Sequence, residues 1–336
     1  MKILVTGGAG FIGSHIVERL VRDGAKVRVI DNFSAGKMDN IRHNINKIDL
    51  IRGDIRDISA VKKAVRGVKY IIHEAAMKSV PESLKRPEEF NDVNVNGTLN
   101  IIIQAQKAQV KRLVFASSSS VYGDVKILPQ KESFIPAPIS PYGATKLIGE
   151  TYCRTFSRIT ARTTERSGRP ARQTRSGGYP LEIIALRYFN VFGPRQDPDS
   201  PYAGVIIKFI NAMLKNKQPI IFGDGKQSRD FTYIDNVVEG TIACLKTSVS
   251  INGLVFNIAS SNPITVIELV KSLNKLLGKN IKPIFTPIRT GDIKHSYADI
   301  TLACKYLGYK TIVPFVQGLA KTIEYLRKQR AWNIPA

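Results

Sequence analysis

Short apolar runs alternate with amphipathic stretches along the first 190 residues of the chain. The runs are typical of strands buried on both faces of a sheet, and they predict strands over 2–6, 26–30, 49–52, 68–73, 112–116 and 181–188. Between the runs, apolar residues recur every three or four positions, which predicts helices over 14–22, 59–66, 87–109 and 142–159. This strict alternation predicts an α/β fold with a Rossmann-type, doubly wound parallel sheet.

The pattern is less regular after residue 190. It predicts helices over 203–216, 235–247, 266–277 and 315–328, and short strands over 219–222, 255–258 and 282–286. We therefore expect a dinucleotide-binding domain over 1–180 and, mainly within 181–336, a smaller mixed α/β substrate domain that closes over the sheet edge.

A glycine-rich turn joins the first predicted strand to the first helix. Gly8, Gly10 and Gly13 match G-x-G-x-x-G, Gly7 lies at the start of the turn, and Asp31 follows the second strand. Glycines allow a pyrophosphate to approach the backbone at a helix N-terminus, and a carboxylate at the position of Asp31 accepts from ribose hydroxyls. Because a carboxylate repels a 2′-phosphate, the sequence predicts NAD rather than NADP.

Two later stretches carry polar residues suited to catalysis, one at the end of a predicted strand and one at the start of a predicted helix. A run of four serines, 117–120, ends one strand, and Tyr142 and Lys146 share a helix face four residues apart. An ammonium beside the phenol favours the phenolate, so we expect Lys146 to lower the pKa of Tyr142 and make it a base. A tyrosine and a lysine at this spacing are also common on ordinary helix faces; the glycine turn and the serine run favour the catalytic interpretation.

Composition narrows the class of protein. The chain has 336 residues, 43% of them hydrophobic, and its three cysteines are far apart and not in metal-ligand spacing. We expect no metal site and reduced thiols in a cytoplasmic protein, with neither a membrane span nor a signal peptide. The net charge of +23 fits anionic small molecules, anionic surfaces or nucleic acid. The lysines are spread along the chain without a nucleic-acid motif, so nucleic acid is not the expected partner.

With these motifs in order, the chain resembles the extended short-chain dehydrogenases/reductases. It is most similar to nucleotide-sugar epimerases of the UDP-glucose and UDP-N-acetylglucosamine 4-epimerase type. The resemblance covers nearly the whole chain except about 160–178. It implies catalytic roles for Ser118, Tyr142 and Lys146.

The resemblance also implies binding residues. NAD contacts fall on Gly7, Gly10, Phe11, Ile12, Gly13, Asp31, Asn32, Asp54, Ile55, Ala75, Ala76, Lys78, Asn94, Tyr142, Lys146 and Tyr188. Contacts to the UDP-sugar fall on Lys78, Ser118, Tyr142, Asn190, Arg229, Arg289 and Ser296, the two arginines on the diphosphate. In such enzymes Tyr142 would take the proton of the sugar 4-hydroxyl, and C4 would pass through a ketone before the hydride returns to its opposite face. A homodimer is implied, with 86–109 and 142–159 at the interface.

Other functions remain open. A 4,6-dehydratase would need an Asp-Glu pair where this chain has Ser119 and Ser120. Epimerases and decarboxylases that act on UDP-glucuronate share the motifs found here. A non-enzymatic alternative is an NAD- and RNA-binding protein, against which the intact Ser118, Tyr142 and Lys146 argue.

The segment 160–178 departs from the family pattern. It contains Arg162, Arg166, Arg169, Arg172 and Arg175 against a single acid, Glu165, and almost no large apolar residue. It is interpreted either as a basic arm for an anionic partner or as a solvated insertion outside the ancestral fold, and we prefer the second interpretation.

Overall fold

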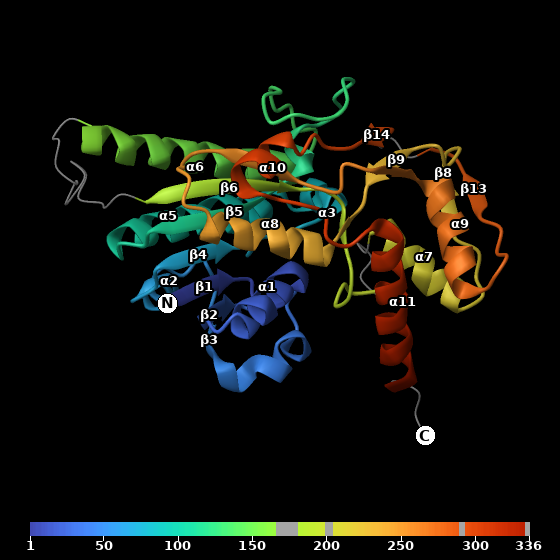
Figure 1. Cartoon of the computed structure of the whole chain (residues 1–336), viewed down its shortest axis with the longest axis horizontal. Coiled ribbons are helices and arrows are strands. Elements are labelled where there is room, and N and C mark those ends of the chain that lie inside the picture. Colours follow the sequence, from blue (N-terminus) through green and yellow to red (C-terminus); the bar gives the residue numbers. More distant parts are fainter. Residues whose placement is uncertain (166–180, 199–203, 289–292, 333–336) are drawn as a thin grey trace.

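A seven-stranded parallel sheet forms the centre of the computed structural model, which describes residues 1–165, 181–198, 204–288 and 293–332 (Figure 1). The strands, in spatial order, are β3 (Ile48–Arg52), β2 (Lys26–Asp31), β1 (Lys2–Thr6), β4 (Tyr70–His73), β5 (Arg112–Ser118), β6 (Glu182–Tyr188) and β11 (Val255–Ile258). All six neighbouring pairs are parallel. The winding reverses between β1 and β4, so the predicted Rossmann-type sheet is confirmed.

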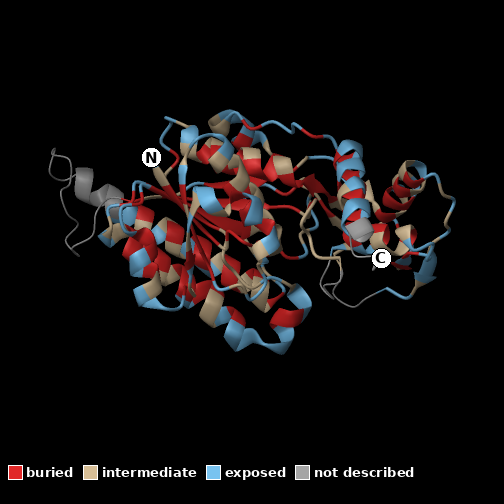
Figure 2. Ribbon diagram, turned by 90° about the horizontal axis from the view of Figure 1, so that it is seen from below, coloured by how far each residue is buried: buried red, intermediate tan, exposed pale blue. Residues whose placement is uncertain are grey.

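Helices cover both faces of the sheet because its strands are apolar on both sides (Figure 2). Ile3 and Val5 of β1 pack into one core, which includes α1 (Phe11–Arg22) and α8 (Ile234–Lys246). Leu4 lies in the core on the other face. That second core includes α2 (Ile58–Val65), α5 (Gly97–Lys107) and α6 (Pro141–Glu165).

A smaller mixed α/β lobe lies at one end of the sheet (Figure 1). Its described elements are β7 (Val191–Phe192), α7 (Val205–Leu214), β8 (Ile220–Phe222), β9 (Ser228–Asp230), β10 (Thr232–Tyr233), β12 (Pro263–Thr265), α9 (Val266–Leu277), β13 (Ile284–Thr286), β14 (His295–Ser296) and α11 (Phe315–Trp332). Helix α10 (Thr301–Leu307) instead packs against β11 and α8. The assignment of 181–336 mainly to substrate binding remains a proposal. Within that range, β6 and β11 extend the central sheet.

Several elements differ from the sequence prediction. The helix predicted over 87–109 consists of α4 (Pro87–Asn91), a π-helical segment (Asp92–Asn96) and α5. Helices α3 (Val80–Lys85) and α10 and strands β7, β9, β10, β12 and β14 were not predicted, because elements of two to seven residues show at most two turns of a helix or one repeat of a strand. The three-residue strands β8 and β13 fall within the predicted ranges 219–222 and 282–286. Helix α6 continues to Glu165 and so includes the first residues of the basic insertion, whose remainder lies outside the described residues.

The described part of the chain bears on the state of the cysteines and on membrane-spanning helices. Cys153 and Cys244 are buried and Cys304 is exposed, and all three are free thiols. Among the described residues, no helix is both long enough and apolar enough to cross a membrane.

Candidate active site

The glycine turn lies at the carboxyl end of β1, where it leads into α1. Gly7 has a positive φ of 66°, and its carbonyl oxygen accepts a hydrogen bond from the Gly10 amide at 3.0 Å. A Cβ on Gly13 would lie 2.2 Å from that same oxygen, so the turn can close only around glycine. Gly10 caps α1 without a side-chain hydrogen bond, and Phe11 and Ile12 form the first helical turn. The free amides of this turn suit an anionic group.

Asp31 connects the end of β2 to the glycine turn. Its carboxylate accepts from the Ala9 amide at 2.9 Å and from the Phe33 amide at 2.8 Å. Burial raises the pKa of Asp31, and the two amide donors oppose that rise. Each carboxylate oxygen retains a lone pair for a further donor, such as a ribose hydroxyl.

The next strand end contributes Asp54 and Ile55. Asn32 donates to Asp54 at 2.8 Å, which joins the carboxyl ends of β2 and β3. Hydrogen bonds from Arg56 lower the pKa of Asp54 to about 2. Ile55 is buried. These four predicted cofactor residues, Asp31 included, therefore lie along one edge of the sheet.

The loop after β4 is fixed by buried side chains. The Thr6 hydroxyl lies 2.6 Å from His73 Nδ1 and accepts from the Ala75 amide at 3.1 Å. Asn94, in the π-helical segment, bonds both the amide and the carbonyl of Met77 and also donates to Thr145. Its side chain thus joins this loop, which includes Ala75, Ala76 and Lys78, to α6.

Tyr142 and Lys146 lie in the first two turns of α6, which packs on β5 and on the serine run. A Cβ on Gly143 would lie 2.6 Å from the Ser120 carbonyl oxygen, so glycine permits this close approach. The buried Lys146 ammonium donates to the Ala116 carbonyl at 2.7 Å. The Ser118 hydroxyl bonds Ser120 and also interacts with the Tyr142 hydroxyl. The structure therefore brings together all three predicted catalytic residues.

The electrostatics of the pair differ from the prediction. Burial raises the pKa of Tyr142, a hydrogen bond with Ser118 opposes this, and Glu74 raises the pKa further. Burial also lowers the pKa of Lys146 to about 8. The expectation that Lys146 lowers the pKa of Tyr142 is wrong for this structure, because burial raises that pKa and the Lys146 ammonium donates its hydrogen bond to the Ala116 carbonyl.

Lys78 is an exposed residue in the loop that follows β4. The protein around its side chain lowers its pKa, and the charge of Asp197 opposes that change. Asp197 also forms an ion pair with Lys37 at 2.9 Å. The two lysines and the aspartate thus bring the loop after β4, the segment after β2 and the loop after β7 close to one another.

Tyr188, at the end of β6, was predicted to contact NAD. Its hydroxyl lies 2.9 Å from a Glu74 carboxylate oxygen and 2.8 Å from the Thr241 hydroxyl. Both contacts involve protein groups, so any contact between Tyr188 and a cofactor would involve its ring. Glu74 was not selected from the sequence as a site residue, since a lone acid after a strand carries no motif.

A buried ion pair holds α6, the helix that carries Tyr142 and Lys146, against the sheet. Glu150 lies one helical turn after Lys146 and accepts from Ser117 at 2.6 Å and from Arg187 at 2.9 and 2.7 Å. Both charged side chains are fully buried. This pair links α6, β5 and β6. The only sequence signal for this pair was that Glu150 lies four residues after Lys146 and so on the same face of the helix. Its partner Arg187 could not be identified until the packing of α6 against β6 was known.

The predicted substrate residues that the structure describes lie in the smaller lobe and just after β6. Ser296 on β14 pairs in register with Arg229 on β9, so these two residues are neighbours although 67 positions separate them in sequence. The Ser296 hydroxyl donates to Gln130 at 3.1 Å, and the Arg229 guanidinium donates to the Ser228 and Lys294 carbonyls. Asn190 has a positive φ of 31° at the end of β6. Arg289 lies outside the described residues.

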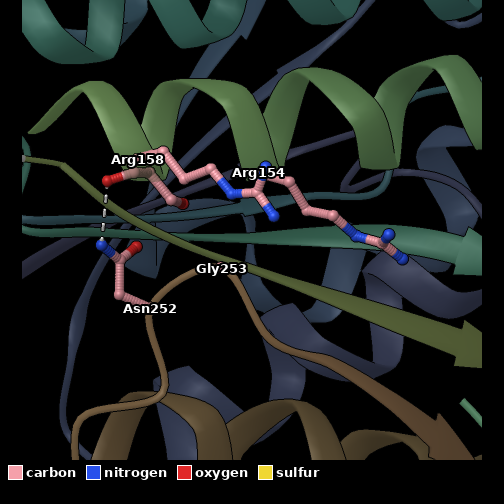
Figure 3. A pocket seen from close by; sticks show the side chains of 5 residues that line it. Arg154, Arg158, Asn252 and Gly253 are labelled. Atoms are coloured by element: carbon pink, nitrogen blue, oxygen red, sulfur yellow. Dashed lines mark hydrogen bonds between the residues drawn. The ribbon is translucent and has the colours of Figure 1, made fainter. Parts of the chain in front are cut away.

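A separate basic pocket lies on the outer part of α6 (Figure 3). It is lined by Arg154, Ser157, Arg158, Asn252 and Gly253, and an Asn252 amide donates to the Ser157 carbonyl at 3.4 Å. None of the predicted site residues lines it. It therefore plays no part in the arrangement described above.

Comparison with known proteins identifies the family of the chain. Residues 3–259 match the family described as the NAD dependent epimerase/dehydratase family. A "Putative UDP-glucose 4-epimerase" of Methanocaldococcus jannaschii is 37% identical over 327 residues, covering 97% of this chain and 98% of the relative. A UDP-N-acetyl-alpha-D-glucosaminuronate decarboxylase of Bacillus cytotoxicus is 33% identical over 97% of this chain and 98% of its own length.

Solved structures are similar over nearly their whole length. The UDP-glucose 4-epimerase of Thermotoga maritima with UDP-glucose is 36% identical at a TM-score of 0.88, covering 98% of this chain and 100% of that one. The UDP-N-acetylglucosamine 4-epimerase of Methanobrevibacter ruminantium, in complex with UDP-N-acetylmuramic acid, is 38% identical at 0.86, with 98% of both chains covered. The UDP-glucuronic acid 4-epimerase of Bacillus cereus, with UDP-glucuronic acid and NAD, is 32% identical at 0.84, covering 98% and 100%.

Proposed function

The chain belongs to the NAD-dependent epimerase/dehydratase family, within the extended short-chain dehydrogenases/reductases, and on that premise we propose that it epimerises UDP-sugars at C4. The proposed substrates are UDP-glucose or UDP-galactose and, in addition, UDP-N-acetylglucosamine or UDP-N-acetylgalactosamine. NAD is the cofactor of this family.

One observation carries the proposal. Ser118, Tyr142 and Lys146 come together at the carboxyl edge of the parallel sheet, on the edge that also holds the glycine turn and Asp31. This is the edge at which doubly wound sheets bind dinucleotides. A phenol, an ammonium and a hydroxyl grouped there suit the removal and return of a hydroxyl proton.

The residues around the cofactor site fit a dinucleotide. The open first turn of α1 suits the pyrophosphate, Asp31 suits the adenosine ribose, and Asn32, Asp54 and Ile55 flank the same edge. Lys146 would hold the nicotinamide ribose, and Ala75, Ala76, Lys78 and Asn94 would form the wall along β4. When bound, NAD supplies a reversible hydride acceptor.

The chain's own side chains handle the proton. Tyr142 takes the proton of the sugar 4-hydroxyl while C4 is oxidised to a ketone, and it gives the proton back when C4 is reduced on the opposite face. Ser118 donates a hydrogen bond to the oxygen on C4. The buried Lys146 ammonium offsets the negative charge that Tyr142 holds as phenolate.

The smaller lobe is proposed to hold the nucleotide. Arg229, together with Arg289, would bind the diphosphate, and Asn190 would contact the sugar nucleotide. Ser296, a small residue next to Arg229, would leave room for an N-acetyl group on the sugar. A homodimer formed through 86–109 and 142–159 is part of the same proposal.

Product identification tests the proposal. The purified protein is offered UDP-glucose, UDP-N-acetylglucosamine and UDP-glucuronate separately, and the products are identified by chromatography against standards. We expect the C4 epimers of the first two. If none of the three is converted although NAD binds, the proposed reaction is wrong.

A second candidate is favoured by the similarity to proteins that act on UDP-uronates. Epimerisation of UDP-glucuronate would yield an acidic product of unchanged mass, whereas decarboxylation would release carbon dioxide. A 4,6-dehydratase would yield a keto-deoxy sugar, and Ser119 and Ser120 lack the acid/base groups for this. Salt-dependent RNA binding without any turnover would favour the non-enzymatic alternative.

A further inference from the structure

Asp230 is a buried carboxylate of the smaller lobe with no part in the mechanism above. It is the last residue of β9, directly after Arg229, and it is 0% exposed. One carboxylate oxygen accepts from the Ser260 amide at 2.9 Å, and the other accepts from the Ser261 amide at 3.0 Å and from the Ala298 amide at 3.2 Å. Backbone N–H groups can only donate, so all three contacts require Asp230 to act as an acceptor.

These amides belong to two segments that are distant in the sequence. Ser260 and Ser261 follow β11, the edge strand of the central sheet, whereas Ala298 lies two residues after Ser296 of β14. The two segments are also bonded to each other, because the Ser261 hydroxyl donates to the Ala298 carbonyl at 2.8 Å. Asp230 therefore joins β9 and β14 to the end of β11, where the lobe meets the central sheet (Figure 1).

The end of β11 is aligned with the proposed catalytic serine. Ser118 of β5 pairs in register with Tyr188 of β6, and Tyr188 pairs in register with Ile258 of β11. Neighbouring strands are about 4.8 Å apart, so Ile258 lies about 10 Å from Ser118 across the sheet. The amides that Asp230 binds begin two residues after Ile258. Asp230 therefore fixes the lobe to the part of the sheet that carries Ser118.

The strands of the lobe do not reach the central sheet by strand pairing. β9 has three residues and β14 has two. In the described part of the chain they pair with each other and with β12, and with none of the seven strands of the central sheet. Side-chain hydrogen bonds such as those of Asp230 therefore supply the directional contacts between these strands and the end of β11.

We propose that Asp230 is a positioning residue that fixes Arg229 and Ser296 relative to Ser118. This inference rests on the proposed function, in which the lobe holds the nucleotide and Ser118 contacts the oxygen on C4. A substrate held at both ends reacts only when the two ends are correctly spaced, and a misplacement of about 1 Å can lower the rate about 100-fold. The reaction should therefore depend on Asp230 more strongly than the binding of UDP or NAD does.

The variant that tests this is Asp230→Asn, which keeps the size of the side chain but replaces one acceptor oxygen with an NH2 group among amide donors. For the UDP-sugar that the wild type converts, we expect kcat per UDP-binding site to fall at least about tenfold. The dissociation constants of UDP and NAD should change less than about threefold. Counting kcat per UDP-binding site removes the effect of any unfolded fraction. If kcat per site is unchanged, or if UDP binding weakens as much as kcat falls, the proposal is wrong.

Glu268→Ala is the matched control. Glu268 lies in the same lobe and forms the capping box of α9, where its carboxylate accepts from the Thr265 amide at 2.8 Å and from the Thr265 hydroxyl at 2.7 Å. The variant should lower the melting temperature, because the cap is lost, but it should keep the kcat of the wild type per UDP-binding site. A fall in kcat equal to that of Asp230→Asn would show that any weakening of the lobe has this effect, and the proposal would be wrong.

Ser260→Ala is a second variant in case Asp230→Asn does not fold. The Ser260 hydroxyl donates to the Phe231 carbonyl at 3.1 Å, so its loss weakens the same junction without changing a buried charge. We expect kcat per UDP-binding site to fall about two- to threefold with UDP binding unchanged. If Asp230→Asn does not fold and Ser260→Ala keeps the kcat of the wild type, the proposal is overturned.

Amide hydrogen exchange measures the junction without any substrate. In Asp230→Asn, the peptides that cover 259–262 and 297–299 should exchange at least about tenfold faster than in the wild type, whereas Glu268→Ala should leave them unchanged. If the wild type converts no UDP-sugar but this protection is lost in Asp230→Asn, only the proposed reaction fails. If the wild type turns over and Asp230→Asn keeps its kcat, only this inference fails.

Discussion

Tyr142 is the residue on which the proposed chemistry depends most directly. We expect Tyr142→Phe to lose about 10²- to 10⁴-fold in kcat, because the hydroxyl that carries the proton is gone. The ring should still pack edge-on against Phe90, whose centroid lies 6.4 Å away, so the fold should persist. Steady-state kinetics, circular dichroism and the content of bound NAD measure the three effects. Near-normal turnover would remove Tyr142 from the mechanism.

Asp31 is expected to select the cofactor. Its carboxylate faces the glycine turn and accepts from the Ala9 amide, so a 2′-phosphate placed there would meet a negative charge that the turn holds in position. We expect NADP to bind at least about tenfold more weakly than NAD, a difference of about 1.4 kcal/mol. Equilibrium titration of the cofactor-free protein measures both affinities, and equal values would contradict the assignment.

Ser296 is expected to control access for N-acetylated sugars. It is buried, and its hydroxyl donates to Gln130, so a larger side chain has little free space. Ser296→Tyr should reduce kcat/KM for UDP-N-acetylglucosamine several-fold more than that for UDP-glucose. Ser296→Ala removes the hydrogen bond without adding volume and should affect both substrates equally. Equal losses in Ser296→Tyr would show that volume at this position does not select the sugar.

At the scale of elements, the Glu150–Arg187 pair joins the catalytic helix to the sheet. Glu150→Ala would leave a fully buried guanidinium without its carboxylate, which costs about 3–5 kcal/mol in a typical core. Urea denaturation should show this loss of unfolding free energy. The control is Arg154→Ala, because Arg154 lies 3.6 Å from Glu150 with its side chain 42% exposed, and its loss should cost below about 1 kcal/mol. If both variants lose the same small amount of unfolding free energy, the buried Glu150–Arg187 pair contributes little to stability.

At the scale of the whole molecule, the basic insertion is expected to be separate from catalysis. Removing 160–178 should leave epimerisation largely intact. Along α6, Ile159 lies 17 residues after Tyr142, which is roughly 25 Å at about 1.5 Å per residue. This exceeds the Debye length of about 8 Å at physiological salt, so the arginines have little effect on the charge of the site.

The deletion also leaves the general charge of the molecule in place. It removes five arginines and one glutamate, so the net charge changes from +23 to +19. Steady-state kinetics and sedimentation should be compared with those of the full chain, because the insertion begins on a helix proposed to pack in the dimer. A variant that keeps its oligomeric state but loses more than about tenfold in kcat/KM, about 1.4 kcal/mol of transition-state stabilisation, would show that the insertion contributes to catalysis.

Much of the fold could be predicted because its signals are local. The period of apolar residues depends only on the backbone geometry of a strand or helix. The predicted first and last residues of β1, β11 and α9 therefore match those of the structure. The glycine turn and Asp31 could also be predicted, because a strand, a tight turn and a helix leave few alternatives to glycine. Two-residue strands such as β14 show no period and could not be predicted.

The tertiary structure decided which groups meet and in which protonation state. The pKa of Tyr142 depends on burial and on Glu74, which sequence separation conceals, and so it is raised where the spacing to Lys146 alone predicted it lowered. The pairing of Ser296 with Arg229 follows from strand register, which no local pattern encodes. The sequence thus determined the elements and the candidate chemistry, because both follow from neighbouring residues. The packing between distant segments determined the electrostatics, because desolvation and charge act through space.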